Sequence, residues 1–187
     1  MAKEKPPQVY RLKITLKDIE PTVWRRVEVA DCSLYELHHV IQRIMEWDGS
    51  HLWLFTIRDE RYGDPSMDDD QDASEFQLSE FVKKRVKKFT YWYDFGDDWM
   101  HIIEVEKPVD ADPLARYPRC VGGERAGPPE DCGGPWGYGG FVAALRDPHH
   151  ARHDEIKEWF DGPYDPEAFD LDAINERFAP PKPKRKK

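Results

Sequence analysis

The sequence predicts an α+β fold: a mainly antiparallel sheet of about five strands, one long helix packed across it, and a helical C-terminal section. Residues 9–29 and 89–107 each alternate apolar and polar side chains on both sides of a turn-like segment, which is typical of β-hairpins. Residues 32–47 carry apolar side chains at helical spacing. These three segments supply most of the predicted core.

The chain has 187 residues, enough for one domain with a hydrophobic core, and no internal repeat divides it. We expect a single domain over residues 9–178, with disordered ends at residues 1–8 and 179–187. The net charge is −9, although five of the residues 182–187 are basic. Because an acidic body repels nucleic acid, contact with nucleic acid is expected only through the basic C-terminal tail.

The sequence favours a cytoplasmic protein without membrane contact. No apolar run approaches the ~20 residues of a membrane-spanning helix, and the N-terminal residues lead into a strand pattern instead of a signal-peptide core. The three cysteines, Cys32, Cys120 and Cys132, are an odd number. Free thiols are therefore expected, and not a disulfide framework.

The first part of the chain predicts the order strand, strand, helix, strand, which is similar to the start of a β-grasp fold. Residues 9–16 and 23–29 form the first predicted hairpin. The helix begins after Ser33, which with Glu36 three residues later matches a capping box. Residues 51–58 are rich in β-branched and aromatic residues and suit a strand buried on both faces.

The middle of the chain combines clear elements with a segment of loop composition. Residues 59–75 contain eight acidic residues and are predicted to form an exposed loop. A short amphipathic helix is expected over residues 78–88. At the tip of the second hairpin, DFGDD has turn chemistry, because Gly96 can take a positive φ and aspartates bond to nearby backbone amides.

The segment over residues 110–140 is so rich in glycine and proline that a long functional loop is expected. Trp136, Tyr138 and Phe141 favour an ordered and packed loop, because each would lose ~1.5 to 3 kcal/mol in water. Two or three short helices should follow, over residues 141–147, 153–160 and 165–179.

Several separate motifs in a fixed order make the chain resemble a known family. They are PTVWRRVEV at 21–29, LHHVIQRIMEWDGSHLWLF at 37–55, YDFGDDWMH at 93–101, CVGG at 120–123 and PPEDCGGPWGY at 128–138. The sequence is similar to the plasmid pRi ORF-three-like family of prokaryotic proteins over roughly residues 9–178. That family occurs on plasmids and chromosomes and includes passenger proteins of insertion sequences. The resemblance thus implies a link to mobile genetic elements, and no particular reaction.

The second hairpin and the Gly/Pro-rich segment are predicted to pack together and form a binding cleft. Its candidate residues are Tyr93, Asp94, Asp97, Asp98, Trp99, His101, Glu130, Asp131, Trp136 and Tyr138. The five carboxylates among them are candidate ligands for a divalent metal. The alternative is that the aspartates bond to backbone amides in the turn and that His101 is a core histidine. His38 and His51 could converge, but surface or capping roles are favoured for them.

Two functions fit these observations. An aromatic wall with carboxylates at its edge suits an interaction module that binds a protein, a peptide or a small-molecule ligand. The alternative is a divalent-metal-dependent phosphoesterase or nuclease that uses the carboxylates. No cofactor is evident apart from such a metal. Convergence of the carboxylates on one opening is the observation that would decide between a ligand site and a set of turn contacts.

Overall fold

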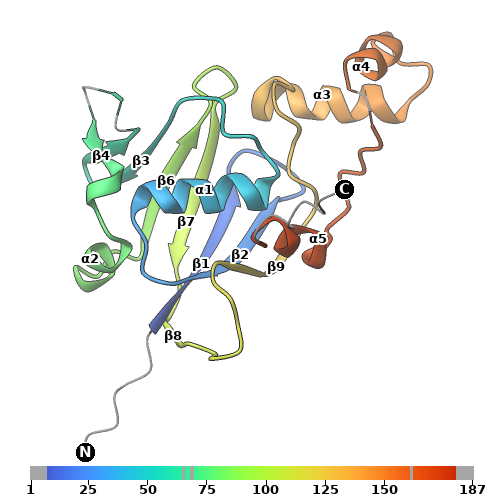
Figure 1. Ribbon diagram of the computed structural model, residues 1–187. Coiled ribbons are helices and arrows are strands. Elements are labelled where there is room, and N and C mark those ends of the chain that lie inside the picture. The colour runs from blue at the N-terminus through green and yellow to red at the C-terminus, as the bar shows by residue number, and fades with distance from the viewer. Residues whose placement is uncertain (1–7, 65, 68–69, 161, 180–187) are drawn as a thin grey trace, which may run out of the picture.

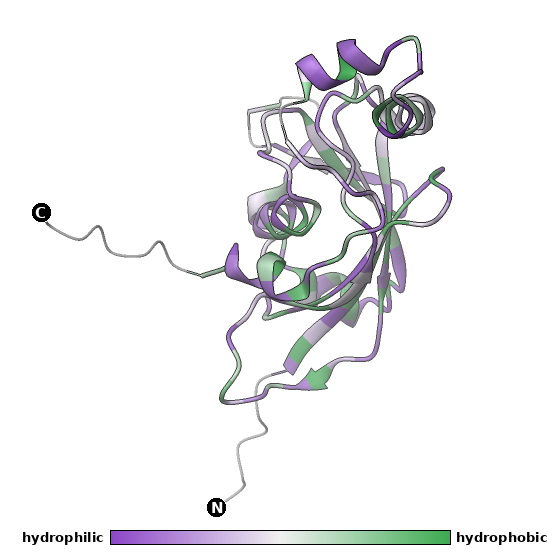
Figure 2. Ribbon diagram, turned by 90° about the vertical axis from the view of Figure 1, so that its right-hand side faces the viewer, coloured by the Kyte–Doolittle hydropathy of each residue, from purple (hydrophilic) through white to green (hydrophobic). Residues whose placement is uncertain are grey.

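The computed structural model describes residues 8–64, 66–67, 70–160 and 162–179. They form one large sheet with helices packed against it (Figure 1). In the side view of Figure 2, helix α1, Leu34–Met45, and the sheet form two layers. Of the predicted disordered ends, residues 1–8 and 179–187, only Gln8, which begins a strand, and Ala179 are described; the rest, with the basic tail, lies outside the described residues. None of the helices described is long and apolar enough to cross a membrane.

Within the described residues the sheet has nine strands, so the prediction of about five was wrong. The strands are β1 Gln8–Leu16, β2 Trp24–Val29, β3 Trp53–Ile57, β4 Glu60–Gly63, β5 Gln71–Asp72, β6 Lys88–Tyr93, β7 Trp99–Val105, β8 Val109–Asp110 and β9 Arg119–Glu124. Their order is β5-β4-β3-β6-β7-β1-β2-β9, with β8 beside β1. All pairings of these strands are antiparallel except that of β4 with β5. The predicted mainly antiparallel sheet is confirmed, and its five predicted strands form a continuous central block.

The additional strands lie in segments whose composition is typical of loops. β4 belongs to the acidic stretch, where the exposed-loop prediction is wrong for Tyr62, a buried residue. β9 belongs to the Gly/Pro-rich segment, where the long-loop prediction is wrong because residues 119–124 pair with β2 in the sheet. A Cβ on Gly123 would lie 2.6 Å from the ring of Phe169 and 2.8 Å from the carbonyl oxygen of Trp24. Glycine at this position therefore allows the ring of Phe169 and the backbone of Trp24 to lie close to the strand.

The part of the chain that the structure describes contains five α-helices beside the sheet, and the prediction of one long helix was wrong. They are α1, α2 Leu78–Lys83, α3 Gly134–Arg146, α4 His153–Trp159 and α5 Leu171–Glu176. At 13 residues, α3 is slightly longer than α1, which has 12. It begins inside the predicted loop, with Gly133 as N-cap at φ 92° and Pro135 in its first turn. Trp136 is 86% exposed, so its predicted packing is wrong, whereas Tyr138 is buried.

The C-terminal helical section is confirmed, although its last helix is shorter than predicted. Within residues 165–179 only α5 is α-helical, and the carboxylate of Asp170 caps it by accepting from two backbone amides. The side-chain amide of Asn175 accepts from the backbone nitrogen of Cys120 at 2.8 Å and donates to its carbonyl oxygen at 3.0 Å. The helix thereby covers the outer edge of β9.

Helix α1 has defined contacts at both ends. The predicted capping box is present, because Ser33 Oγ accepts from the backbone of Glu36 and the Glu36 carboxylate accepts from the backbone of Ser33. At the other end, a Cβ on Gly127 would overlap the carbonyl oxygen of Met45. The indole nitrogen of Trp47 donates to the carbonyl oxygen of Pro128 at 2.8 Å. The segment that precedes α3 is therefore held against the C-terminal end of α1.

A buried arginine joins the same end of α1 to the sheet. Arg25 on β2 is 1% exposed. Its guanidinium donates to the carbonyl oxygen of Ile44 at 3.0 Å and to those of Trp24 and Glu124 at 2.9 Å each. Burial lowers the pKa of Arg25 below its usual value, but an arginine keeps its charge. One side chain thus satisfies carbonyl groups of α1, β2 and β9.

Two histidines lie inside the aromatic core without charge. His101 on β7 exposes none of its surface, and its Nδ1 lies 3.1 Å from the carbonyl oxygen of Trp99. His38 on α1 stacks on Trp53 at 4.1 Å between ring centroids, and its Nδ1 lies 2.7 Å from the hydroxyl of Tyr91. Burial lowers the pKa of His38 to about 3 and the pKa of His101 to about 4. Both rings are therefore neutral at pH 7.

We expect Arg25→Ala to lower the free energy of unfolding by about 3 kcal/mol, because buried carbonyl oxygens lose their donor. Arg26→Ala is the matched control. Arg26 is partly exposed and pairs with Glu106 at 2.9 Å, so its loss should cost less than about 1 kcal/mol. Urea denaturation followed by tryptophan fluorescence measures both variants. Equal losses would contradict a special role for the buried guanidinium.

We expect acid to destabilise the protein through His38 and His101. In the unfolded chain the pKa of a histidine is about 6.5, so below that pH the unfolded state binds protons that the folded state excludes. Stability is then lost as the pH falls from about 6.5 toward 4, by about 2 kcal/mol for each histidine at pH 5. The unfolding free energy should therefore differ between pH 7 and pH 5 by about 2 kcal/mol less in His101→Gln than in the unchanged protein.

The control for this pH experiment is His149→Gln, since His149 is exposed. Urea denaturation at the two pH values should give His149→Gln the same difference as the unchanged protein. If His101→Gln also kept the full difference, the neutral state of His101 would be refuted.

Candidate functional site

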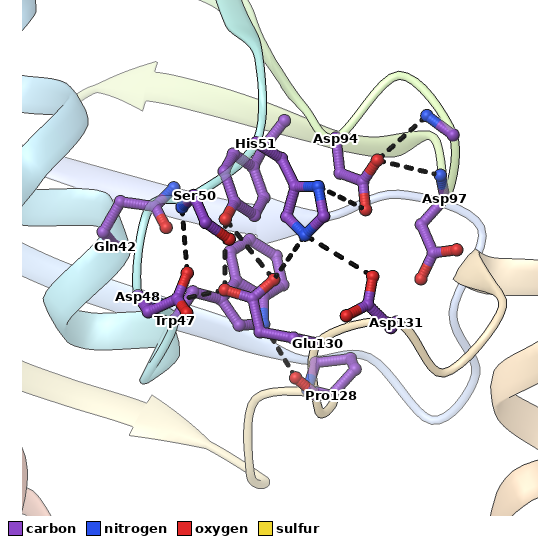
Figure 3. A network of polar contacts seen from close by, with 12 residues as sticks. Gln42, Trp47, Asp48, Ser50, His51, Asp94, Asp97, Pro128, Glu130 and Asp131 are labelled. Atoms are coloured by element: carbon purple, nitrogen blue, oxygen red, sulfur yellow. Dashed lines mark hydrogen bonds and ion pairs between the residues drawn. The ribbon is translucent and has the colours of Figure 1, made fainter.

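Three segments that are distant in the sequence meet beyond the C-terminal end of α1 (Figure 3). They are the connection from α1 to β3 at residues 46–52, the tip of the β6–β7 hairpin at residues 94–98, and residues 128–133 before α3. The predicted contact between the second hairpin and the Gly/Pro-rich segment is therefore present. The connection after α1 is an additional component.

The hairpin tip is held by its own aspartates. The Oδ1 atom of Asp94 accepts from the backbone nitrogens of Gly96 at 2.9 Å and Asp97 at 3.3 Å. Asp94 and Asp98 take φ values of 53° and 61°, whereas Gly96 is not among the positive-φ glycines of the described residues. The predicted turn is present, but aspartates and not Gly96 take its left-handed positions. At Asp94 the bonds from its side chain to the local backbone favour this conformation.

The hairpin tip is also attached to the start of α3. The carboxylate of Asp97 accepts from the backbone nitrogen of Gly133 at 3.1 Å. A Cβ on Gly134 would overlap the carbonyl oxygen of Asp97, and Gly134 has a φ of 66°. The two backbones can approach this closely only at glycine. This contact fixes the position of the neighbouring Glu130 and Asp131 relative to the hairpin.

A histidine occupies the centre of the junction. Nδ1 of His51 lies 3.6 Å from Oδ2 of Asp94. On the other side of the ring, Nε2 lies 3.5 Å from Oδ1 of Asp131 and 3.8 Å from Oε2 of Glu130. Figure 3 shows the imidazole between these carboxylates. His51, Asp94 and Asp131 offer ligand atoms that all lie within 4.8 Å of one another.

Hydrogen bonds hold the carboxylate of Glu130 beside His51. Its Oε1 accepts from the backbone nitrogen of Asp48 at 2.9 Å and from the hydroxyl of Tyr93 at 3.1 Å. The ring of Tyr93 stacks on Trp47 at 4.9 Å between centroids. Burial raises the pKa of Glu130, and burial together with the Glu130 charge raises the pKa of Tyr93. A positive charge beside Glu130 would therefore stabilise its ionised form.

The ten predicted cleft residues have different surroundings. Tyr93, Asp94, Glu130 and Asp131 belong to the junction around His51, and Asp97 borders it through Gly133. Asp98 is exposed on the same turn. Trp99 and His101 are fully buried in the core. On α3, Trp136 is exposed, and Tyr138 is buried with its hydroxyl 2.8 Å from that of Tyr164.

His51 is the central residue of the junction, and the sequence prediction did not include it in the cleft. Its partners there are carboxylates and not His38, with which convergence was considered. Its ring nitrogens face Asp94, Glu130 and Asp131, which come from two other segments. No local spacing connects these residues. The available signal was the position of His51 directly after the well-predicted helix.

A pocket of about 320 Å³ adjoins the junction at Asp131. Residues 131–133 line it together with the apolar side chains of Phe141, Ile156 and Trp159 from α3 and α4 and with the ion pair of Arg152 and Glu155. Asp131 is 66% exposed and lies between this pocket and His51. A ligand at the carboxylates would thus have space for a further group.

Comparisons with known proteins show a family, a relative and a solved structure to which the chain is similar. The family model described as plasmid pRiA4b ORF-3-like protein matches residues 8–173. The uncharacterized protein y4hQ of Sinorhizobium fredii (strain NBRC 101917 / NGR234) is 42% identical over 173 residues, which cover 89% of each chain. The crystal structure of the protein of unknown function MM3350 from Methanosarcina mazei Go1 is similar, with a TM-score of 0.82 and 33% identity. That match covers 88% of this chain and 96% of the other.

The family match spans both hairpins, α1, β9 and the Glu130–Asp131 segment, and therefore includes every residue around His51. The resemblance predicted from the sequence motifs is confirmed, and the chain belongs to the plasmid pRiA4b ORF-3-like family.

Proposed function

We propose that the protein is a binding module whose site is the carboxylate cluster of Asp94, Glu130 and Asp131 around His51, and that its ligand carries positive charge. One observation carries the proposal: both ring nitrogens of a single imidazole face carboxylates from different segments. A histidine in a turn or cap needs one partner. Three carboxylates around it form a site of high negative potential.

The charge balance of the cluster supports a cationic ligand. Among the described residues, no lysine or arginine forms an ion pair with Asp94, Glu130 or Asp131. Like charges at such separations repel, more strongly when they are partly buried. The surrounding backbone contacts, such as that of Gly134 with Asp97, hold the carboxylates near one another despite this repulsion. A bound cation would relieve it.

The adjoining pocket supports a ligand larger than a single ion. Its apolar side, formed by Phe141, Ile156 and Trp159, continues from Asp131. A peptide or small molecule could place a positive group at the carboxylates and an apolar group in the pocket. The link to mobile elements and the cytoplasmic location stay predictions.

A divalent-metal-dependent phosphoesterase or nuclease is the second candidate. The observation that favours it is the proximity of ligand atoms from His51, Asp94 and Asp131, since a metal held there could activate a water molecule. Hydrolysis of bis(p-nitrophenyl) phosphate with added Mn²⁺ or Mg²⁺ tests it. Activity that disappears in Asp131→Asn would support the enzyme, and a rate equal to that of the metal alone would reject it.

We expect Asp131→Asn to weaken cation binding by about tenfold or more, because a charged contact is lost at the opening of the site. The measurement is the rise in melting temperature with Zn²⁺, Mn²⁺, Mg²⁺, Ca²⁺, agmatine and spermidine, followed by calorimetric titration of those that stabilise. Asp131 makes no side-chain hydrogen bond to the described residues, so the variant should fold normally.

The matched control is Asp98→Asn, which removes the same charge from the exposed side of the hairpin tip. It should change the affinity by less than about twofold, because the lost charge is screened by solvent. The proposal fails if none of these cations raises the melting temperature of the unchanged protein. It also fails if the two variants weaken binding equally.

A further inference from the structure

We propose that the cluster is a binding site for a borderline divalent transition-metal ion such as Zn²⁺. The ligands are Nε2 of His51 and the carboxylates of Glu130 and Asp131, and Asp94 is the positioning residue for the imidazole. The inference rests on the proposed function and names the class of cation. It also differs from the ligand set predicted from the sequence: His51 is added, and Asp94, Asp97 and Asp98 are no longer ligands.

The first step concerns the Nδ1 side of His51. Asp94 is the most buried carboxylate of the cluster, with 9% of its side chain exposed. Its Oδ1 is used by the backbone nitrogens of Gly96 and Asp97, and its Oδ2 points at Nδ1 of His51 from 3.6 Å. Oδ2 has no hydrogen-bond donor among the described residues. At 3.6 Å this contact, like those at Nε2, is longer than a hydrogen bond. With a metal on Nε2, the proton of the imidazole would be on Nδ1, and Oδ2 of Asp94 is the acceptor that faces it there.

The second step concerns the Nε2 side. Oδ1 of Asp131 and Oε2 of Glu130 lie 3.5 and 3.8 Å from Nε2 of His51 (Figure 3). In a four-coordinate Zn²⁺ site with bonds of about 2.0 to 2.2 Å, neighbouring ligand atoms are about 3.4 Å apart. Both separations are close to this value. They are longer than a hydrogen bond, so the carboxylates are directed to the space in front of Nε2 and are not bonded to it.

The third step is the rigidity of the ligands. Oε1 of Glu130 accepts from the backbone of Asp48 and from the hydroxyl of Tyr93, and the same hydroxyl lies 3.3 Å from Oε2, the oxygen that faces His51. Asp131 is held in the left-handed region at φ 54° directly after it. The exposed carboxylate of Asp131 gives a path for entry. Three protein ligands leave a fourth position open, next to the pocket of about 320 Å³.

The donor atoms indicate the class of ion. Ca²⁺ and Mg²⁺ prefer oxygen ligands alone, whereas an imidazole nitrogen with two carboxylates suits Zn²⁺ and related ions. The proposed ligand set contains no cysteine. The site is a nitrogen and oxygen site.

The experiment uses the full-length protein after treatment with a chelator, titrated calorimetrically with Zn²⁺ at pH 7.5. His51→Gln should weaken Zn²⁺ binding by at least about 100-fold, and Asp94→Asn by about 10- to 100-fold. The control His149→Gln, at an exposed histidine outside the cluster, should bind as the unchanged protein does. Ca²⁺ should bind weakly and without dependence on His51.

A second measurement remains valid even if His51→Gln does not fold. In the unchanged protein, ¹⁵N NMR of the histidine side chains should show the Nδ1–H tautomer at one ring and a shift of its Nε2 when Zn²⁺ is added. The side-chain amide of Asp94→Asn offers a donor to Nδ1 and should shift this ring toward the other tautomer. A purely structural role of Asp94 would leave the tautomer unchanged.

The outcomes separate the two proposals. One outcome overturns the metal site but keeps the cation-binding module. In it, binding of Zn²⁺ or an organic cation depends on Asp131, yet no Nε2 resonance shifts and His51→Gln binds as tightly as the unchanged protein. If no cation binds, both proposals fail. Loss of Zn²⁺ binding in His51→Gln together with the Nε2 shift supports the assigned ligand set.

Discussion

The packing of the chain around the C-terminal end of helix α1 is the constraint on which the rest of the structure depends. The last carbonyl groups of a helix lack partners within it and must be satisfied from outside. Here Arg25 donates to Ile44, and the glycine at position 127 lets another backbone pass close to Met45. The sheet, the helix and the segment before α3 are joined at this one place. A change in any of them would displace the others.

This constraint also determines the geometry of the candidate site. Trp47 donates to Pro128 just after the helix, and the connection then continues to His51. Since Pro128 lies two residues before Glu130, one hydrogen bond holds two sides of the site at a fixed separation. The third side, the hairpin tip, is fixed to Gly133 by Asp97. Rigid attachment of this kind allows three carboxylates to remain close together around His51, although no lysine or arginine of the described residues pairs with them.

The sequence predicted the elements whose side chains repeat with a clear period, and for a physical reason. The strands on either side of the two hairpin turns and the capped helix α1 bury one regular face, so local pattern and tertiary packing agree. β4 and β9 bury few large side chains, and β9 is built around glycine because Phe169 lies against it. Such a strand is defined by its neighbours and has little pattern of its own. His51 was missed for the same reason, because its partners come from other segments.

The motif YDFGDDWMH combines structural and chemical roles in single residues, which explains why its chemistry was ambiguous in the sequence. In Asp94, one carboxylate oxygen accepts from the backbone of the turn and the other faces His51. Any substitution there affects the turn and the site together. Asp131 and His51 lie outside the motif. The Asp131 side chain contacts His51 and makes no hydrogen bond to the described residues. The chemistry of the motif is therefore best examined through residues that the motif does not contain.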